Sequence, residues 1–276
     1  MSFNQLASET FGIDFEEWYQ KGYWNNRYIP YSFANGDRVV ANISVNLIDF
    51  VMKGEEKKAI QIGTVMTHPD YRGQGLSKQL MNRVLEDYKD YDFIYLFANE
   101  TVLNFYPKFG FHAIQESQFS MDTIPLQTNI SRIRKLDVNN DEDRELIYKL
   151  ATERQPISKL FGTKHTQHLS MFYSIYVFAD QIYYIKEEDT IVIFELEQDV
   201  LYIYDIISRT SQNTEHIISK IIDENTKKIV FHFTPNLKEL QAKSQPYNGT
   251  EVLFVKMNGD HIEFPSQFKH PKTSQA

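Results

Sequence analysis

The stretch THPDYRGQGLS, residues 67–77, decides how the first half of the chain is interpreted, because two patterns of different period meet there. Residues 59–67 are predicted to be a strand, the partner of residues 38–51, in which Val39, Ala41, Ile43, Val45 and Leu47 alternate as they do in a half-buried strand. From Leu76 onward the apolar side chains recur every three or four residues, which is the period of a helix. Gly73 and Gly75 lie between the two patterns. The stretch is therefore predicted to join a strand to a helix through a tight glycine turn.

The segments on either side of this turn predict an α+β (α/β) fold. The pair Asn35-Gly36 is typical of a two-residue hairpin turn and separates two segments with strand character. The other expected elements, in chain order, are a helix over 3–24, strands over 38–51 and 59–67, a helix from Leu76, a strand over 93–98, a short helix over 101–109 and a strand over 111–121. This order is that of a mixed, mostly antiparallel sheet flanked by helices.

The second half is predicted to repeat this order in outline. Its expected elements are strands over 133–137, 171–178, 181–185, 190–196, 200–207, 229–233 and 252–257, with helices over 141–152 and around 217–222. Residues 64–85 and 206–222 occupy equivalent places in the two copies, but residues 208–214 lack the glycines. A polar segment places the domain boundary after residue 125, which gives domains 1–125 and 126–276. Residues 270–276 are expected to form a loose tail.

The composition excludes several classes of chemistry. The 276 residues include 29 Lys and Arg against 37 Asp and Glu, a formal net charge of −8, and aromatic residues make up 14%. No cysteine is present, so disulfides, thiolate nucleophiles and zinc–thiolate clusters are excluded. The acidic balance argues against nucleic acid and anionic membranes as partners. No signal peptide or membrane-spanning segment is found in the pattern, so a cytoplasmic protein is expected.

The glycine turn has the composition of an anion-binding site. The free N–H groups at the start of the following helix carry a partial positive charge. Gly73 and Gly75 have no side chain to keep an anion away from the backbone, and Arg72 and Lys78 add positive charge. Such a site suits a pyrophosphate group.

Two motifs in this region resemble those of the GNAT acetyltransferase superfamily. The loop Arg72-Gly73-Gln74-Gly75-Leu76-Ser77 is similar to its acetyl-CoA loop, Arg/Gln-x-x-Gly-x-Gly/Ala, with Ser77 at the final small position. Residues 99–111, NETVLNFYPKFGF, resemble its second signature, Asn-x-x-Ala-x-x-Leu-Tyr-x-Lys-x-Gly-Phe. The two-copy arrangement resembles tandem GNAT proteins of the enhanced-intracellular-survival type, with an active first copy and a degenerate second copy.

This resemblance implies an acetyl-CoA-dependent N-acetyltransferase that transfers acetyl directly to an amine of a small molecule or peptide. Tyr106 would be the catalytic acid that protonates the leaving thiolate. The implied cofactor-binding residues are Val65, Met66, Thr67, Arg72, Gly73, Gln74, Gly75, Leu76, Ser77, Lys78 and Asn99. Of these, Val65 to Thr67 would act through their backbone on the pantetheine arm and the thioester carbonyl, and Asn99 has the alternative role of capping the short helix.

The sequence identifies neither the general base nor the acceptor amine. Candidates for the base are His68, Glu16, Glu17 and a terminal carboxylate at Ala276. No metal site is expected, because the pairs His165/His168 and Glu195/Glu197 lack a third ligand at a telling spacing. The alternative functions are a non-catalytic acyl-CoA sensor and a tRNA-dependent aminoacyltransferase, the latter disfavoured by the negative charge. The second copy is expected to bind no cofactor, and the oligomeric state is left open.

Overall fold

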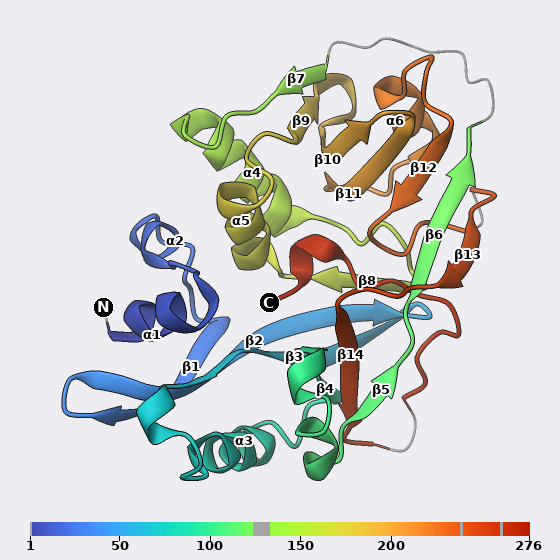
Figure 1. The fold of residues 1–276 in the computed structure, drawn as a ribbon. Helices are drawn as coiled ribbons and strands as arrows, with labels where there is room; N and C mark the ends of the chain where they lie inside the picture. The colour runs from blue at the N-terminus through green and yellow to red at the C-terminus, as the bar shows by residue number, and fades with distance from the viewer. Residues whose placement is uncertain (1, 124–132, 238–239, 260–261) are drawn as a thin grey trace.

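The computed structural model describes residues 2–123, 133–237, 240–259 and 262–276. Two seven-stranded sheets lie one above the other, with helices between them and on their outer faces (Figure 1). The first sheet has the order β1-β2-β3-β4-β14-β5, with β8 also paired to β2, and the second has the order β13-β6-β12-β11-β10-β9-β7. Most neighbouring strands are antiparallel, which confirms the predicted fold class.

The first sheet begins as the sequence predicts. Its early strands are β1 (Tyr28–Asn35), β2 (Arg38–Met52), β3 (Glu55–Thr67), β4 (Phe93–Asn99) and β5 (His112–Ile114). The predicted hairpin is present, but its two turn residues are Gly36 and Asp37, because Asn35 still belongs to β1 and pairs with Arg38. Helix α3 (Leu76–Asp87) packs on the outer face of this sheet through Leu80, Met81 and Val84.

Two helical predictions in the first half are corrected. The helix expected over 3–24 divides into α1 (Ser2–Phe11) and α2 (Glu16–Gln20), because Gly12 has a positive φ of 69° that no helix continues through. The helix expected over 101–109 is instead two short 3₁₀ turns, Glu100–Val102 and Tyr106–Phe109. Pro107 lies in the second turn and has no N–H group for an α-helical bond. No helix in the described part of the chain is long and apolar enough to cross a membrane.

The second half contains β7 (Ile133–Lys135), α4 (Asp141–Glu153), β8 (Phe161–Lys164), α5 (Gln167–Tyr176), β9 (Ile182–Ile185), β10 (Thr190–Glu197), β11 (Val200–Ser208), α6 (Thr214–Ile221) and β12 (Lys228–Phe231). The strand predicted over 171–178 is wrong, since most of it belongs to α5. Residues 171–176 of this helix are apolar or aromatic except for Ser174, and periodicity does not distinguish such a run from a buried strand.

The repeat predicted from the sequence is present in the topology. In the first half β2 pairs antiparallel with β3, and α3 then leads into β4, which is parallel to β3. In the second half β10 pairs antiparallel with β11, and α6 leads into β12, which is parallel to β11. Helix α6 packs on the outer face of the second sheet, as α3 does on the first.

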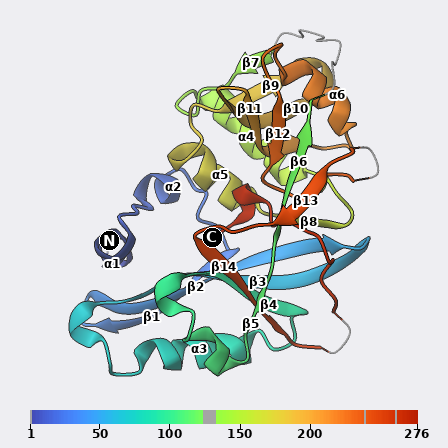
Figure 2. The ribbon, with the colours of Figure 1, turned by 45° about the vertical axis from the view of Figure 1, so that its right-hand side comes forward.

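The two halves exchange strands. Strand β14 (Glu251–Met257) lies between β4 and β5 in the first sheet, whereas β6 (Ser117–Asp122) lies between β12 and β13 (Lys243–Pro246) in the second. Figure 2 shows the chain passing from β5 in the lower sheet to β6 in the upper one. The boundary predicted after residue 125 lies outside the described residues. Because of the exchange, residues 1–125 and 126–276 do not each contain one whole sheet.

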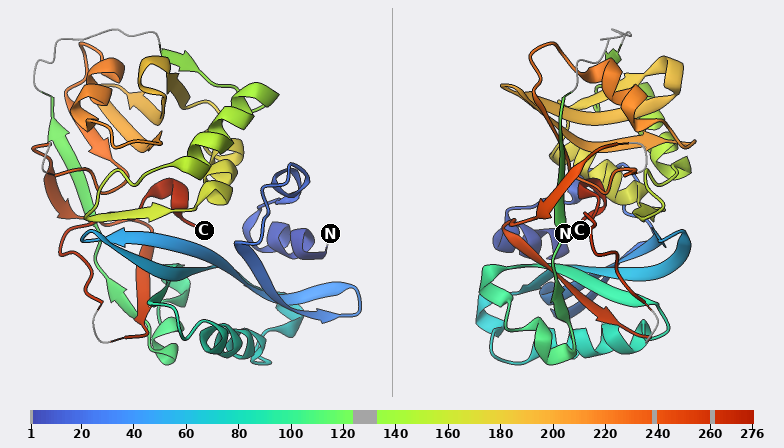
Figure 3. Two further views of the ribbon diagram at one scale, coloured as in Figure 1. Left: turned by 180° about the vertical axis from the view of Figure 1, so that it is seen from behind. Right: turned by 90° about the vertical axis from the view of Figure 1, so that its right-hand side faces the viewer.

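The prediction of a loose tail over 270–276 is wrong. Thr273 and Ser274 are fully buried, and the marked C-terminal end lies between the two halves (Figure 3). The Thr273 hydroxyl donates to the buried Asp205 carboxylate, which also pairs with Arg154, and the Ser274 hydroxyl lies 2.8 Å from that of Thr163. Short polar side chains carry no period, so their burial could not be predicted from the sequence.

Candidate active site

The candidate site begins where β3 and β4 part. The two strands pair in parallel from Ala59/Phe93 to Ile62/Leu96 and then separate. Directly beyond this point Thr64 has a positive φ of 49°, and the register between β2 and β3 shifts, which is a β-bulge. Between the parted strands lies a cavity of about 710 Å³, lined by Ile62 to Thr67 on one side and Phe97 to Asn99 on the other.

The glycine loop lies at one end of this cavity. Gly73 and Gly75 have φ angles of 77° and 76°, in the left-handed region, and Gly75 is the N-cap residue of α3. A Cβ at either glycine would meet no atom within 4 Å, so the backbone conformation is what requires glycine here. The loop is held to the end of β3, because the Arg72 Nε donates to the Thr67 carbonyl oxygen at 3.2 Å. The first N–H groups of α3 are therefore presented on an exposed loop.

The predicted cofactor-binding residues divide into two groups. Val65, Met66, Thr67, Arg72, Ser77 and Asn99 line the cavity. Gly73, Gln74, Gly75, Leu76 and Lys78 do not line it and lie on the adjoining loop and first turn of α3. The Ser77 hydroxyl lies 2.7 Å from the Thr67 hydroxyl, which ties the helix start to the strand end. The motif thus forms one continuous surface from the cavity to the start of α3.

Tyr106 lies in the wall of the cavity on the second 3₁₀ turn. Its ring is 5% exposed and packs against the rings of Phe105, Phe111 and Phe254, with Phe254 supplied by the exchanged strand β14. Burial raises the pKa of Tyr106 to about 12, so the hydroxyl stays protonated at neutral pH. Asn99 also lines the cavity, but its Oδ1 accepts from the Thr101 N–H at 3.0 Å and thus caps the adjacent turn.

The opposite wall of the cavity is aromatic. It is built by α1, α2, β1 and α5, which contribute Phe11, Phe15, Trp18, Tyr28, Phe172 and Tyr173. The Trp18 indole N–H donates to the His168 carbonyl oxygen at 2.8 Å, and its ring meets that of Phe172 at a centroid distance of 6.1 Å. These contacts join the N-terminal helices to α5 of the second half, so both halves of the chain build this wall.

The C-terminal segment enters the same cavity. Lys272, Gln275 and Ala276 line it, together with Glu251 at the start of β14. A Cβ on Gly63 would lie 3.3 Å from Ala276, so a larger residue here would require Ala276 to shift by a few tenths of an ångström. The Gln61 amide donates to the Ala276 carbonyl oxygen at 3.1 Å, which fixes the segment against β3.

Comparison with known proteins assigns the first part of the chain to a family. The model of an acetyltransferase (GNAT) domain matches residues 2–114. Residues 2–114 form a GNAT domain. An algal protein from Gracilaria tenuistipitata var. liui, named "uncharacterized N-acetyltransferase ycf52", is 46% identical over 52 residues. That match covers 18% of this chain and 29% of the algal protein, so the chain aligns with less than a third of its relative.

Solved structures share the fold over most of the chain. A probable N-acyltransferase from Enterococcus faecalis V583 has a TM-score of 0.58 at 16% identity, covering 93% of this chain and 69% of that one. A GCN5-related N-acetyltransferase from Kribbella flavida has a TM-score of 0.57 at 16% identity, with the same two coverages. Eis1 from Mycobacterium abscessus has a TM-score of 0.52 at 13% identity, covering 82% of this chain and 63% of that one. The two-sheet fold, with its second GNAT-like half, is thus shared with these proteins.

Several residues that the sequence singled out lie outside the cavity of the GNAT domain. The His68 imidazole contacts the Arg38 guanidinium at 2.7 Å, and Glu16 accepts from Asn4 and Gln20. Glu17 pairs with Lys21. None of these three candidate bases lines the cavity.

The two histidines considered as metal ligands lie in different surroundings. The His165 ring contacts Asp49 at 2.6 Å, and His168 is buried with its pKa lowered to about 3 by loss of solvation. Among the described residues, no three His, Cys, Asp or Glu side chains gather in a way that could hold a metal ion.

Glu251 is a cavity residue that the sequence did not reveal. It lies 145 residues beyond Tyr106 in the chain (251 − 106) and enters the site only because β14 joins the first sheet. A strand start carrying a glutamate has no distinguishing pattern. Its place could be inferred only from the strand exchange.

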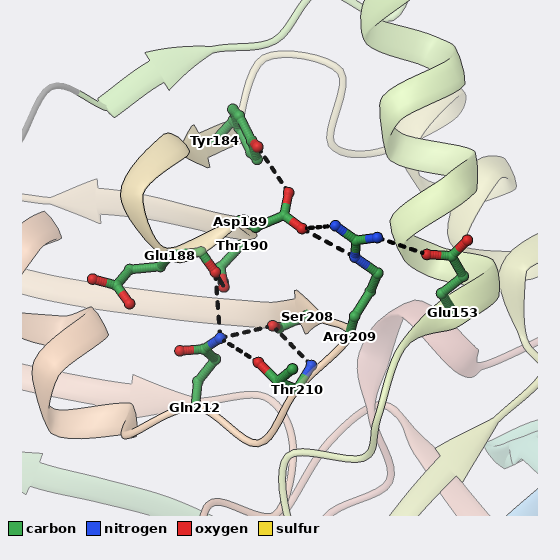
Figure 4. A network of polar contacts seen from close by, with 9 residues as sticks. All are labelled: Glu153, Tyr184, Glu188, Asp189, Thr190, Ser208, Arg209, Thr210 and Gln212. Carbon is green, nitrogen blue, oxygen red and sulfur yellow. Dashed lines mark hydrogen bonds and ion pairs between the residues drawn. The ribbon is translucent and has the colours of Figure 1, made fainter.

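The second half has no comparable loop at the equivalent position. Figure 4 shows that the side chains of the segment after β11 make polar contacts with one another and with neighbouring residues. The Arg209 guanidinium contacts the carboxylates of Asp189 and Glu153, and the Gln212 amide donates to the Ser208 hydroxyl at 2.9 Å (Figure 4). These contacts bring negative charge to the place where the first half presents free N–H groups. That the second half binds no cofactor stays a prediction.

Proposed function

We propose that this protein is an acetyl-CoA-dependent N-acetyltransferase that transfers acetyl directly to an amine of a small molecule or peptide. The observation that carries the proposal is the single cavity between the parted strands β3 and β4, which has a glycine loop at its end and Tyr106 in its wall. Acyl transfer is supported by the GNAT domain, while the choice of acetyl-CoA and of an amine belongs to the proposal.

The residues present fit a coenzyme A thioester. The left-handed glycines Gly73 and Gly75 and the exposed Arg72 and Lys78 suit the pyrophosphate. Beyond them, Val65 to Thr67 lie on the part of β3 that has left β4, so their backbone is available to an extended pantetheine arm. When bound, acetyl-CoA supplies an activated acyl carbon, which gains a bond to the amine nitrogen while its bond to sulfur breaks.

The protein's own groups would act on two atoms of that thioester, the carbonyl oxygen and the sulfur. A backbone N–H at the bulge, at Val65 or Met66, would donate to the carbonyl oxygen as negative charge develops there, an effect worth about 3 kcal/mol per donor. The Tyr106 hydroxyl would donate its proton to the departing sulfur and recover one from solvent. The amine nitrogen loses its surplus proton to solvent. Protons are thus balanced without a covalent enzyme intermediate.

Acetyl-CoA binding and thiol release test the proposal separately. The wild-type chain should bind acetyl-CoA in a calorimetric titration and release free CoA with at least one member of an amine library. The library should include polyamines, aminoglycosides, amino acids, aralkylamines and peptide N-termini. Binding without thiol release for any amine would favour the acyl-CoA sensor, and absence of binding would contradict both functions.

A further inference from the structure

The acceptor side of the cavity holds one negative and one positive side chain. Glu251 and Lys272 line it near the aromatic wall, whereas Arg72 lies at the glycine loop. Among the described residues, Glu251 is the single carboxylate side chain that lines the cavity. The side chains on this side therefore offer one carboxylate to one cationic group.

Gln275 fixes the two charged groups relative to each other. Its side-chain amide donates to the Glu251 Oε2 at 2.7 Å, and its Oε1 accepts from the Lys272 ammonium at 3.1 Å. Glu251 is paired across the strands with Asn99, the last residue of β4, and its side chain is exposed. A carboxylate is thus held on the cavity side of β14 by a neutral neighbour, which leaves its charge available to a ligand.

The rest of the acceptor side is apolar and aromatic. The Lys272 ammonium lies 5.9 Å from the centroid of the Tyr173 ring, and Phe172 and Trp18 continue this surface toward the N-terminal helices. Flat aromatic faces bind apolar bodies and also attract ammonium groups. The surroundings of Glu251 therefore match a ligand with one cationic group on an apolar or aromatic body.

We propose that Glu251 binds the ammonium group of the acceptor, and that the acceptor is a monoamine with an aromatic or bulky apolar body. This inference rests on the proposed acetyl transfer, because it names the substrate class of the same cavity. Glu251 is an acceptor-binding residue in this account. It holds the ammonium form, and the amine then loses one proton to solvent before its nitrogen attacks. Polyamines and aminoglycosides are expected to be poorer acceptors, since a second ammonium group meets the like charge of Lys272 and finds no second carboxylate side chain among the described residues that line the cavity.

The test combines kinetics with binding of the amine itself. With wild type, kcat/KM for 2-phenylethylamine or tryptamine is expected to exceed that for spermidine or kanamycin by tenfold or more. Glu251→Gln keeps the size of the side chain and is expected to raise KM for 2-phenylethylamine about tenfold, since a charge-assisted contact is lost. KM for acetyl-CoA should stay unchanged. Calorimetric affinity for 2-phenylethylamine, measured with CoA present, should fall by the same factor.

Two controls separate charge from folding. Glu215→Gln removes an exposed carboxylate on α6 and should change none of these values. 2-Phenylethanol, which has the same body without a charge, should inhibit wild type and the Glu251→Gln variant equally. Melting temperatures report whether each variant is folded.

The outcomes distinguish this inference from the proposed function. Preferred transfer to spermidine or kanamycin, or an unchanged affinity of Glu251→Gln for 2-phenylethylamine, would overturn the inference and leave acetyl transfer standing. Failure of wild type to acetylate any amine would overturn the proposed function. In that case Glu251-dependent binding of 2-phenylethylamine would still support the assigned amine site, and its absence would remove it.

Discussion

The loop after β3 and the loop after β11 stand at the same place in the two halves and differ in what lies at the start of the next helix. Helix α3 begins at Gly75, which makes no side-chain capping bond, so its first N–H groups are open to a ligand. Helix α6 begins after Asn213, whose side-chain oxygen accepts from the His216 N–H at 3.0 Å. One loop leaves its donors free and the other satisfies a donor with its own chain.

The charges around the two loops differ too, because the arginine of the second loop is paired with carboxylates. Arg72 is exposed and donates to the Thr67 carbonyl oxygen, whereas Arg209 lies between the carboxylates of Asp189 and Glu153. The hydrogen bond from Arg209 lowers the pKa of Asp189, so this carboxylate stays charged. A repeated strand–loop–helix scaffold is therefore not sufficient for an anion site, because the residues at the helix start decide whether one exists.

The largest expected effect concerns a group that the first half places in its cavity. Tyr106→Phe should lower kcat about a hundredfold or more, since the departing sulfur loses its proton donor. Steady-state kinetics should show this change, and calorimetry should give an acetyl-CoA affinity within about twofold of wild type. Tyr202→Phe, on β11 of the second sheet, is the matched control and should leave both values unchanged. A Tyr106→Phe enzyme with normal kcat would remove Tyr106 from the chemistry.

A second effect tests the glycine loop directly. Gly75→Val should weaken acetyl-CoA binding by more than tenfold, because a β-branched residue strains the left-handed backbone by about 1–2 kcal/mol and moves the loop. Gly54→Ala provides the control, since Gly54 has a φ of 86° in the turn between β2 and β3, far from the loop. It should lower the melting temperature without changing acetyl-CoA affinity. Equal losses of affinity in the two variants would mean that general strain, and not the loop, controls binding.

The pH dependence gives a further test of Tyr106. Because burial raises its pKa to about 12, the hydroxyl is a proton donor below that pH and loses this role only as pH rises through it. The rate should therefore show no fall attributable to Tyr106 between pH 7 and about 10. A fall in kcat in this range that disappears in Tyr106→Phe would contradict the raised pKa.

The smallest expected effect is in the second half. Arg209→Gln removes a surface ion pair and should change the stability by about 1 kcal/mol or less, as judged by urea unfolding. It should not change acetyl-CoA affinity, and titration of wild type should give one site per chain. A stoichiometry of two, reduced to one in Arg209→Gln, would show that the second loop also binds the cofactor.

The parts of the fold that the sequence predicts are those whose signal is local. The hairpin between β1 and β2, the glycine loop and α3 all follow from patterns that span fewer than about twenty residues, and they are present, with the hairpin turn displaced by one residue to Gly36-Asp37. The parts that were missed depend on distant partners. The burial of α5 hid its helical period, and the contact between Thr273 and Asp205 joins residues 68 positions apart.

The candidate site follows the same rule. Tyr106 and the cavity-lining residues of the first motif could be named because they belong to two recognisable motifs. Glu251 and Gln275 could not, because no spacing connects them with those motifs. Only the pairing of β14 with β4 brings the acceptor side of the cavity together.

The exchange of β14 and β6 also sets the order in which the molecule can be made. During synthesis β4 has a bare edge until residues 251–257 leave the ribosome, since β14 is the strand that covers it. At that moment Phe254 reaches Tyr106 and Glu251 reaches the cavity, so the cavity is complete only after β14 has been translated. A polypeptide that stops early has the glycine loop but lacks this wall. Completion of the cavity therefore depends on translation through β14 and on slow, long-range strand pairing.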